Sequence, residues 1–155
     1  MIPYGLQMTQ KLNDFLTQNE QKKYATQSGT NMHIKMQNIV ADGEYTHGDI
    51  EIINIIKNRP DLLPYFTKSA KTEVPIAGKN HGQFVSRRID RLLINHDNKT
   101  IDFIDYKTDI NKDEFIDKYR YQLKEYAELL HSAYPDYKIN GYILWLHDWT
   151  LECVC

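Results

Sequence analysis

The sequence predicts an α/β domain whose central mixed sheet is flanked by helices, in the order helix, three strands, helix, strand. Three observations support this class: two strand-like segments joined by a turn, a long amphipathic helix after them, and a near-continuous apolar segment after the helix. This order of elements implies a mixed sheet with helices on its faces.

The N-terminal part is predicted to contain a polar segment and two helices. Residues 1–27 are rich in Gln, Asn and Lys and are interpreted as a leader or linker, so the domain is expected to span residues 28–155. Apolar residues recur at helical spacing from residue 28 to about 42, which predicts a first helix. A second helix is expected over residues 49–57, ended by the Asn58-Arg59-Pro60 segment.

Three strands are expected next. Residues 71–76 form a short extended segment, in which Pro75 favours a sheet edge or a strand end. Residues 83–95 and 100–107 are stronger strand candidates, and the turn-forming segment His96-Asp97-Asn98-Lys99 separates them. The two segments therefore predict a hairpin.

The longest predicted helix follows Thr108. Its apolar residues recur at helical spacing, Asn111 with Glu114 predicts a capping box, and Pro135 lies beyond the end. Residues 141–146 are almost continuously apolar, as in a strand that is buried on both faces. A last short strand is expected over residues 150–154.

Composition limits the function classes. With 155 residues, 41% of them hydrophobic, the chain is expected to form one domain with a substantial core. A net charge of -2 excludes a histone-like protein, so a nucleic-acid partner would need a local basic site. No apolar segment approaches the ~20 residues of a membrane span, and no signal peptide is recognised, so a cytoplasmic protein is expected. Two cysteines, Cys153 and Cys155, are too few for a four-thiolate metal site.

The hairpin carries two carboxylates and a lysine. A turn centred on Asp97-Asn98 pairs residues whose numbers sum to 195, which places Asp90 opposite Asp105. Their Cβ atoms would then lie ~5 Å apart on one sheet face, where like charges are destabilising. Strand alternation places Lys107 on the same face as Asp105.

Three interpretations compete for this cluster. It could be a surface salt bridge, which is the usual role of paired Asp and Lys. It could be a carboxylate pair with one raised pKa that performs acid–base chemistry, although this would not need the lysine. It could also hold Mg²⁺ or Mn²⁺, with the ammonium stabilising the negative charge that develops during hydrolysis of a phosphate ester.

Five short motifs add a family resemblance. In chain order they are Gly29-Thr30-x-x-His33, Thr-Glu73-Val-Pro-Ile, Arg-Ile-Asp90-Arg-Leu, Ile-Asp105-Tyr-Lys107-Thr and Tyr119-x-x-Gln122-x-x-x-Tyr126-Ala. In order and spacing they resemble the nuclease domain of RecB/AddA-type helicase-nucleases, in the PD-(D/E)XK superfamily. The resemblance runs from about residue 28 to 146 and implies a restriction-endonuclease-like core and a Mg²⁺-dependent deoxyribonuclease, with Mn²⁺ able to substitute.

The resemblance also implies roles for individual residues. Asp90 and Asp105 would ligate the metal, assisted by the carbonyl of Tyr106, and His33 would be a further ligand. Lys107 would orient or activate the water and stabilise the transition state. Glu73 would be the acidic residue of the first strand, near the metal through water. Taken alone, His33 would be read as a packed helix histidine and Glu73 as an exposed edge-strand glutamate.

Substrate contacts are expected from the long helix and from basic residues. Gln122 interrupts the apolar stripe of its helix, and a buried amide needs partners that a catalytic neighbour would supply. With Tyr126 it resembles the family's Gln-x-x-x-Tyr signature, expected to support the site or contact DNA, and Tyr119 could stack on bases. A helix-edge Gln and core-packed tyrosines are the alternatives. Arg88 stands where the family usually has glycine. The candidate phosphate contacts are Arg87, Arg88, Arg91, Lys118, Arg120 and Lys124.

The expected context is DNA repair and recombination. The chain has no Gly-x-x-x-x-Gly-Lys-Ser/Thr loop, so it is not expected to bind nucleotide or to be the helicase itself. DNA is the expected partner, together with a helicase subunit or the helicase portion of a longer chain. Two alternatives remain open: a non-catalytic DNA-binding or scaffolding module of the same fold, and a stand-alone endonuclease of a phage or mobile element.

Overall fold

The computed structural model describes residues 29, 31–42 and 46–155. Contacts divide the chain into two units, Met1–Ile34 and Lys35–Cys155, and the second contains the sheet. The domain boundary predicted between residues 27 and 28 lies outside the described residues, and so does the predicted start of the first helix.

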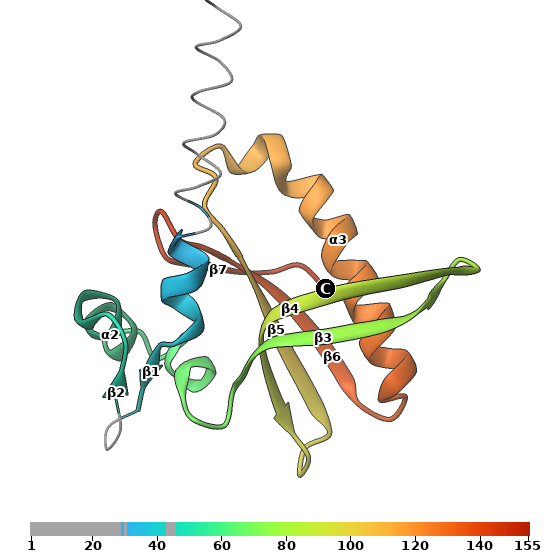
Figure 1. The fold of residues 1–155 in the computed structure, drawn as a ribbon, viewed down its shortest axis with the longest axis horizontal. Helices are drawn as coiled ribbons and strands as arrows, with labels where there is room; N and C mark the ends of the chain where they lie inside the picture. The colour runs from blue at the N-terminus through green and yellow to red at the C-terminus, as the bar shows by residue number, and fades with distance from the viewer. Residues whose placement is uncertain (1–28, 30, 43–45) are drawn as a thin grey trace, which may run out of the picture. The chain divides into compact units, whose positions relative to one another are not determined.

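The larger unit is built on a five-stranded mixed sheet, as the sequence predicts in outline (Figure 1). The strands lie in the order β3-β4-β5-β6-β7, and every neighbouring pair is antiparallel except β5 and β6, which are parallel. Their bounds are Lys71–Asn80 (β3), Gln83–Asn95 (β4), Thr100–Lys107 (β5), Lys138–Trp145 (β6) and Thr150–Cys153 (β7). A parallel pair requires a crossover, and the long helix α3, Lys112–Ala133, provides it between β5 and β6.

Shorter elements precede the sheet. Helix α2 covers Ile50–Lys57 and begins at Asp49, whose side chain accepts the backbone N–H groups of Glu51 and Ile52. A 3-10 helix, η1, covers Leu63–Phe66. The short strands β1 (Val40–Ala41) and β2 (Thr46–His47) pair antiparallel and form a small hairpin.

Two local predictions are wrong. The first helix does not continue to residue 42, because helical residues end at 37 and Val40 pairs with His47 in the β1–β2 hairpin. Among the described residues, Asn111 makes no side-chain cap to the backbone of α3. Its amide instead donates to the carboxylate of Glu114 at 3.0 Å, so the predicted capping box does not form.

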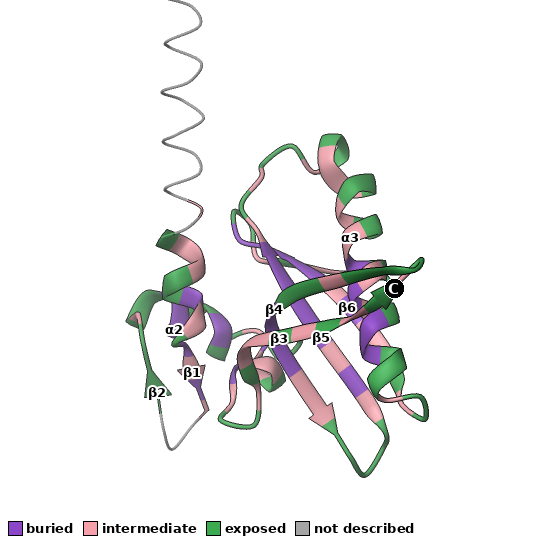
Figure 2. Ribbon diagram, turned by 45° about the vertical axis from the view of Figure 1, so that its right-hand side comes forward, coloured by how far each residue is buried: buried purple, intermediate pink, exposed green. Residues whose placement is uncertain are grey.

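The core lies between the sheet and α3. Buried side chains of the strands and of one face of α3 form a single cluster, and Figure 2 shows buried segments along the centre of the sheet. Its members are Ile89, Leu92, Ile101, Phe103, Leu123, Tyr126, Leu130, Ile143 and Trp145. The opposite face of β5 carries Ile104 and Tyr106, which are also fully buried. Both faces of the sheet centre are therefore excluded from water.

The predicted register of the hairpin is confirmed up to Arg91, but the predicted pair of Asp90 with Asp105 is not among the backbone pairs. Backbone pairs run from Asn95↔Thr100 to Arg91↔Ile104, and in each pair the residue numbers sum to 195. Beyond this point β4 leaves β5 and continues with β3 alone, to the pair Asn80↔Gln83. The departure point is Asp90, so a carboxylate lies where the two strands separate.

Candidate active site

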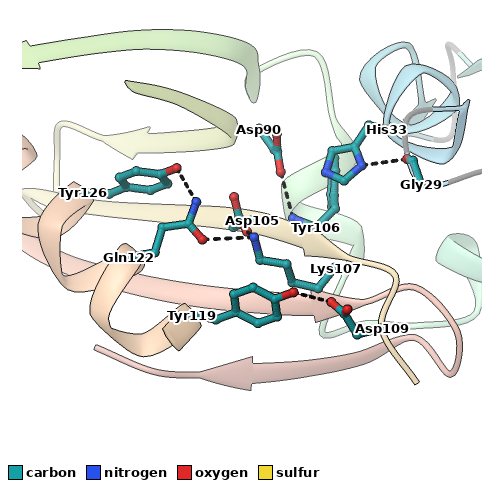
Figure 3. A network of polar contacts seen from close by, with 10 residues as sticks. All are labelled: Gly29, His33, Asp90, Asp105, Tyr106, Lys107, Asp109, Tyr119, Gln122 and Tyr126. Carbon is teal, nitrogen blue, oxygen red and sulfur yellow. Dashed lines mark hydrogen bonds and ion pairs between the residues drawn. The ribbon is translucent and has the colours of Figure 1, made fainter. Parts of the chain in front are cut away.

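The site begins at the point where β4 leaves β5. The Oδ2 atom of Asp90 accepts the backbone N–H of Tyr106 at 2.8 Å (Figure 3). In a strand the N–H and C=O groups of one residue point to the same side. The next residue, Lys107, accepts the N–H of Leu146 on the β6 side at 2.9 Å. The carbonyl of Tyr106 is therefore turned toward the β4 side, where Asp90 lies.

Asp105 and Lys107 form an ion pair on β5. The ammonium of Lys107 lies 2.7 Å from Oδ2 of Asp105, and both side chains are largely buried. Asp90 and Asp105 are 9% and 5% exposed, which is unusual for carboxylates and requires polar or charged partners. An ion pair this deeply buried does not fit the interpretation as a surface salt bridge.

Gln122 connects this ion pair to the helix. Its Oε1 atom accepts a hydrogen bond from the Lys107 ammonium at 3.0 Å, and its Nε2 atom donates to the hydroxyl of Tyr126 at 2.8 Å. Figure 3 shows the row formed by Asp105, Lys107, Gln122 and Tyr126. The amide that interrupts the apolar stripe of α3 therefore has polar partners in this cluster, and one of them is the predicted catalytic lysine.

Tyr119 supports Lys107 from the other side. The ammonium lies 4.2 Å from the centroid of the Tyr119 ring, and the Tyr119 hydroxyl donates to Asp109 at 2.5 Å. The ring also packs against Trp145, with the two centroids 6.0 Å apart. This placement joins Tyr119 to the lysine, whereas the sequence suggested base stacking. Sequence reasoning missed Asp109, since the loop after β5 has no periodicity that would point to it.

The pKa values of two tyrosines of α3, Tyr126 and Tyr119, are raised in this site. Burial, followed by the charges of Asp105 and, more weakly, Asp90, raises the pKa of Tyr126 to about 12. Both carboxylates therefore act on one phenol, as expected if they share one region. The pKa of Tyr119 is raised by burial and by its bond to Asp109. These hydroxyls consequently stay protonated at neutral pH and act as neutral hydrogen-bonding groups.

Glu73 lies at a distortion of β3. Its φ angle of 51° is in the left-handed region, which is uncommon for a residue with a side chain. The pairs Thr72↔Arg91 and Val74↔Ile89 flank it on either side. Glu73 is 3.7 Å from the guanidinium of Arg88, so Arg88 is a neighbour of the predicted acidic residue.

Arg91 has a different place from the one that the sequence suggested. It is 1% exposed, and its guanidinium lies over the Phe66 ring at 4.2 Å. It donates hydrogen bonds to the Tyr106 hydroxyl and to three backbone carbonyls, those of Tyr65, Met36 and Ile39. Arg91 thus joins the sheet to the segments that cover its far face and is not exposed for a phosphate contact. We leave it out of the proposed substrate contacts.

His33 belongs to the smaller unit. Its Nδ1 atom is 2.9 Å from the carbonyl oxygen of Gly29, one helical turn earlier. Its role as a metal ligand stays a prediction.

Three of the remaining basic candidates, Arg87, Arg88 and Arg120, have acidic neighbours, and Lys118 and Lys124 are exposed on α3. Arg87 pairs with Glu125 of α3 at 2.8 Å, and Arg120 lies 3.6 Å from Asp117 and 3.9 Å from Glu152. Arg88 is the most exposed arginine among these pairs, with 67% of its side chain accessible. Contacts of these residues with DNA stay predictions.

The donor set fits a magnesium-type ion better than zinc. Among the described residues no group of three or more His, Cys, Asp or Glu side chains is placed to hold a metal ion. Zinc sites usually require three or four such ligands, whereas Mg²⁺ takes one or two carboxylates and completes its shell with water and substrate phosphate. Asp90, Asp105 and the carbonyl of Tyr106 supply oxygen ligands of this kind.

Comparison with known proteins gives no relative from which a function could be transferred. No protein-family model matches the chain, and no curated protein matches its sequence. No helix that the structure describes is both long enough and apolar enough to cross a bilayer.

Proposed function

We propose that the chain is a Mg²⁺-dependent DNA nuclease with a restriction-endonuclease-like core. The observation that carries the proposal is the convergence of Asp90, Asp105 and Lys107 where β4 separates from β5. By the family resemblance, its context would be a helicase-nuclease that acts in DNA repair and recombination, in which this chain is the exonuclease module.

The charge balance supports a metal site. Asp90 and Asp105 are both buried, and carboxylates that are buried in one region repel each other unless positive charge or hydrogen-bond donors surround them. A divalent cation held by both would supply such charge. Asp90, Asp105 and the Tyr106 carbonyl would hold the ion. When bound, Mg²⁺ would supply Lewis-acid polarisation of the phosphate and a more acidic water. A carboxylate pair that performs acid–base chemistry is a weaker explanation, because it would not need the ammonium that lies beside Asp105.

Lys107 is suited to act at the reacting phosphate. Its ammonium carries three N–H donors, so one remains after its contacts with Asp105 and Gln122. The Tyr119 ring and the Gln122 amide restrict the side chain before substrate arrives. Such preorganised charge stabilises the negative charge that develops on the phosphate oxygens without reorganisation during the reaction.

Several other features agree with the proposal. The three strands, the helix and the following strand have the order that the sequence predicts, and a mixed sheet is consistent with the restriction-endonuclease-like core that the resemblance implies. Glu73, also in a motif of the resemblance, adopts a sparsely populated backbone conformation next to the site, where strain is often found.

The proposal is tested with the full chain on linear DNA. Wild type should degrade DNA with Mg²⁺ or Mn²⁺ and stop when a chelator is added, whereas Lys107→Ala should lose at least about 100-fold in rate. Lys57→Ala is the matched control, because it removes one ammonium from the exposed end of α2. Equal rates for wild type and Lys107→Ala would contradict the catalytic assignment.

Metal binding is measured separately by titration calorimetry. Wild type and Lys107→Ala should both take up Mn²⁺, whereas Asp90→Asn and Asp105→Asn should bind it at least about tenfold more weakly. Absence of uptake by wild type would contradict the proposal. Covalently closed single-stranded circles then distinguish the exonuclease, which leaves them whole, from a stand-alone endonuclease, which opens them.

A further inference from the structure

The hairpin of β3 and β4 extends beyond the rest of the sheet as a two-stranded ribbon. We define this ribbon as residues 74–80 and 83–89. Of the strands that the structure describes, only β3 pairs with residues 83–89, because the β4–β5 pairs stop at Arg91. At about 3.3 Å per residue, seven residues extend ~23 Å. Figure 1 shows the ribbon crossing α3 and ending in a tight turn.

The turn and the inner face explain why the ribbon is ordered. His81 and Gly82 both have positive φ angles, 51° and 78°, as a two-residue type I′ turn requires. An isolated two-stranded hairpin is marginal in water, so the ribbon needs support. Arg87 provides part of it through its 2.8 Å ion pair with Glu125 of α3. Gly78 permits the close approach, since a Cβ atom there would be 3.1 Å from Leu129.

The outer face of the ribbon has a different composition. Strand alternation and the observed pairs put six exposed residues on it. Figure 2 shows the ribbon part of β4 as largely exposed, whereas β3 changes between exposed and intermediate. They form the pairs Pro75↔Arg88, Ala77↔Ser86 and Lys79↔Phe84. The middle pair is small, a cation lies toward each end, and Phe84 near the tip is 72% exposed.

Charge complementarity identifies the partner as a polyanion. Between residues 74 and 89 the sequence has three basic residues, Lys79, Arg87 and Arg88, and no Asp or Glu, although the whole chain has a net charge of -2. With Arg87 turned inward and paired, the outer face presents Lys79 and Arg88, of which Arg88 also lies 3.7 Å from Glu73 at the base of the ribbon. The arm is thus locally basic in a chain that is acidic overall.

The exposed ring of Phe84 indicates which class of polyanion the ribbon binds. Lys79 and Phe84 are direct cross-strand partners, so a cation and an aromatic ring stand side by side. Single-stranded nucleic acid is bound by this combination, in which cations follow the phosphates and aromatic rings stack on bases. Paired bases within a duplex do not offer a face for stacking.

We infer that the outer face of the β3–β4 ribbon binds single-stranded DNA, with Phe84 stacked on a base and Lys79 and Arg88 at phosphates. The choice of DNA rests on the proposed function, because the surface itself requires only a single-stranded nucleic acid. Since β4 runs from Phe84 to Asp90, the ribbon would guide the strand toward the site where β4 leaves β5.

The test is equilibrium binding of the full chain to fluorescent oligothymidylate in the presence of a chelator, which prevents cleavage. Phe84→Leu should weaken binding about tenfold or more, whereas Phe84→Tyr, which keeps an aromatic ring, should stay within about threefold of wild type. The Lys79→Gln/Arg88→Gln variant should reduce the slope of log affinity against log salt by about 1.4, or 0.7 per phosphate contact. Lys57→Gln, a single charge removed from α2, should leave the affinity within about twofold and lower the slope by less than 0.7.

Several outcomes would overturn the inference. If all ribbon variants bind with wild-type affinity, the ribbon is not the binding surface. If Phe84→Leu and Phe84→Tyr lose the same affinity, Phe84 does not bind by stacking on a base. If wild type binds blunt duplex more tightly than oligothymidylate and Phe84 is dispensable, the ligand of the ribbon is duplex DNA rather than single-stranded DNA. Circular dichroism of each variant verifies that the ribbon variants fold.

The binding test and the proposed function can fail independently. If the ribbon variants lose binding while wild type shows no metal-dependent cleavage, the ribbon inference stands and the nuclease proposal fails. If wild type cleaves DNA while its affinity is insensitive to Phe84, Lys79 and Arg88, the reverse holds.

Discussion

The Asp90 carboxylate accepts the Tyr106 backbone N–H at 2.8 Å, directly after the last backbone pair of the β4–β5 hairpin. A side chain thus takes the position that a strand carbonyl would otherwise occupy. This lets β4 turn away from β5 without leaving the buried N–H unpaired, and it fixes the carboxylate beside the Tyr106 carbonyl. The same residue is therefore required by the fold and by the proposed site.

Substitutions at Asp90 should separate these two roles. Asp90→Asn keeps an oxygen that can accept the N–H, so we expect stability within about 1 kcal/mol of wild type and a loss of metal uptake. Asp90→Ala leaves the N–H unsatisfied and should lower the free energy of unfolding by a further 1–3 kcal/mol, roughly. Urea unfolding in a chelator measures both variants. Equal destabilisation by Asn and Ala would show that the charge, rather than the hydrogen bond, is what the fold requires.

Arg91 is expected to act in stability rather than in DNA binding. Its buried guanidinium donates four hydrogen bonds to the phenol and carbonyls around it. Arg91→Ala would leave these acceptors unpaired and should destabilise the fold by about 3–5 kcal/mol. Arg88→Ala, on the exposed neighbour, should change stability by less than about 1 kcal/mol. If Arg91→Ala has the stability of wild type but binds oligothymidylate more weakly, Arg91 contacts phosphate, as the sequence suggested.

The tyrosine shifts predict a loss of stability at alkaline pH. The folded pKa of Tyr126 is about 12, against an ordinary value of 10.0, so the folded state retains a proton that the unfolded state releases. Its contribution is fully present below about pH 10 and is lost as pH rises to about 12. The size is on the order of 3 kcal/mol, because the shift is about two pKa units and each unit corresponds to about 1.4 kcal/mol.

Tyr126→Phe is the control for this titration. Urea unfolding of wild type at pH values from about 8 to about 12 should show a steeper fall than unfolding of the variant. Tyr106, whose pKa burial also raises to about 12, accounts for part of the slope that remains. Parallel stability curves for wild type and Tyr126→Phe would mean that Tyr126 does not titrate as its burial implies.

The parts of the site that lie within one hairpin were predictable from the sequence. The register followed from the turn and the period of the strands, and it held from Asn95 to Arg91. Asp105 and Lys107 were recognised because charged side chains at the end of an apolar strand face are unfavourable unless a partner or a function accounts for them. Gln122 was recognised by the same logic on a helix, and its contact with Lys107 agrees with it.

The remaining features depend on segments that are distant in sequence. The buried place of Arg91 depends on carbonyls of Met36 and Ile39, more than 50 residues earlier, which no local pattern connects to it. The left-handed conformation of Glu73 has no signal in a segment that otherwise reads as a strand. The length of the ribbon was also missed, because Pro75 and Gly78 favour a strand end, whereas the packing on α3 continues β3 to Asn80.

Tyr119 is expected to support Lys107 through its ring rather than through its hydroxyl. The ammonium lies 4.2 Å from the ring centroid, and the hydroxyl is committed to Asp109. Tyr119→Leu removes the cation–π contact, which is worth about 0.5–2 kcal/mol, so we expect a two- to thirtyfold lower kcat, roughly, with little change in KM. Tyr119→Phe keeps the ring and should stay within about threefold of wild type.

A double-mutant cycle on unfolding identifies the contact itself. The effects of Tyr119→Leu and Lys107→Ala on the free energy of unfolding should be coupled by about 0.5–2 kcal/mol, because either substitution alone already removes the cation–π contact. Base stacking by Tyr119 predicts a different result: weaker binding of oligothymidylate by Tyr119→Leu, a higher KM, and no coupling to Lys107. Measurement of kcat, KM and unfolding in the same variants therefore decides whether the ring serves the lysine or the substrate.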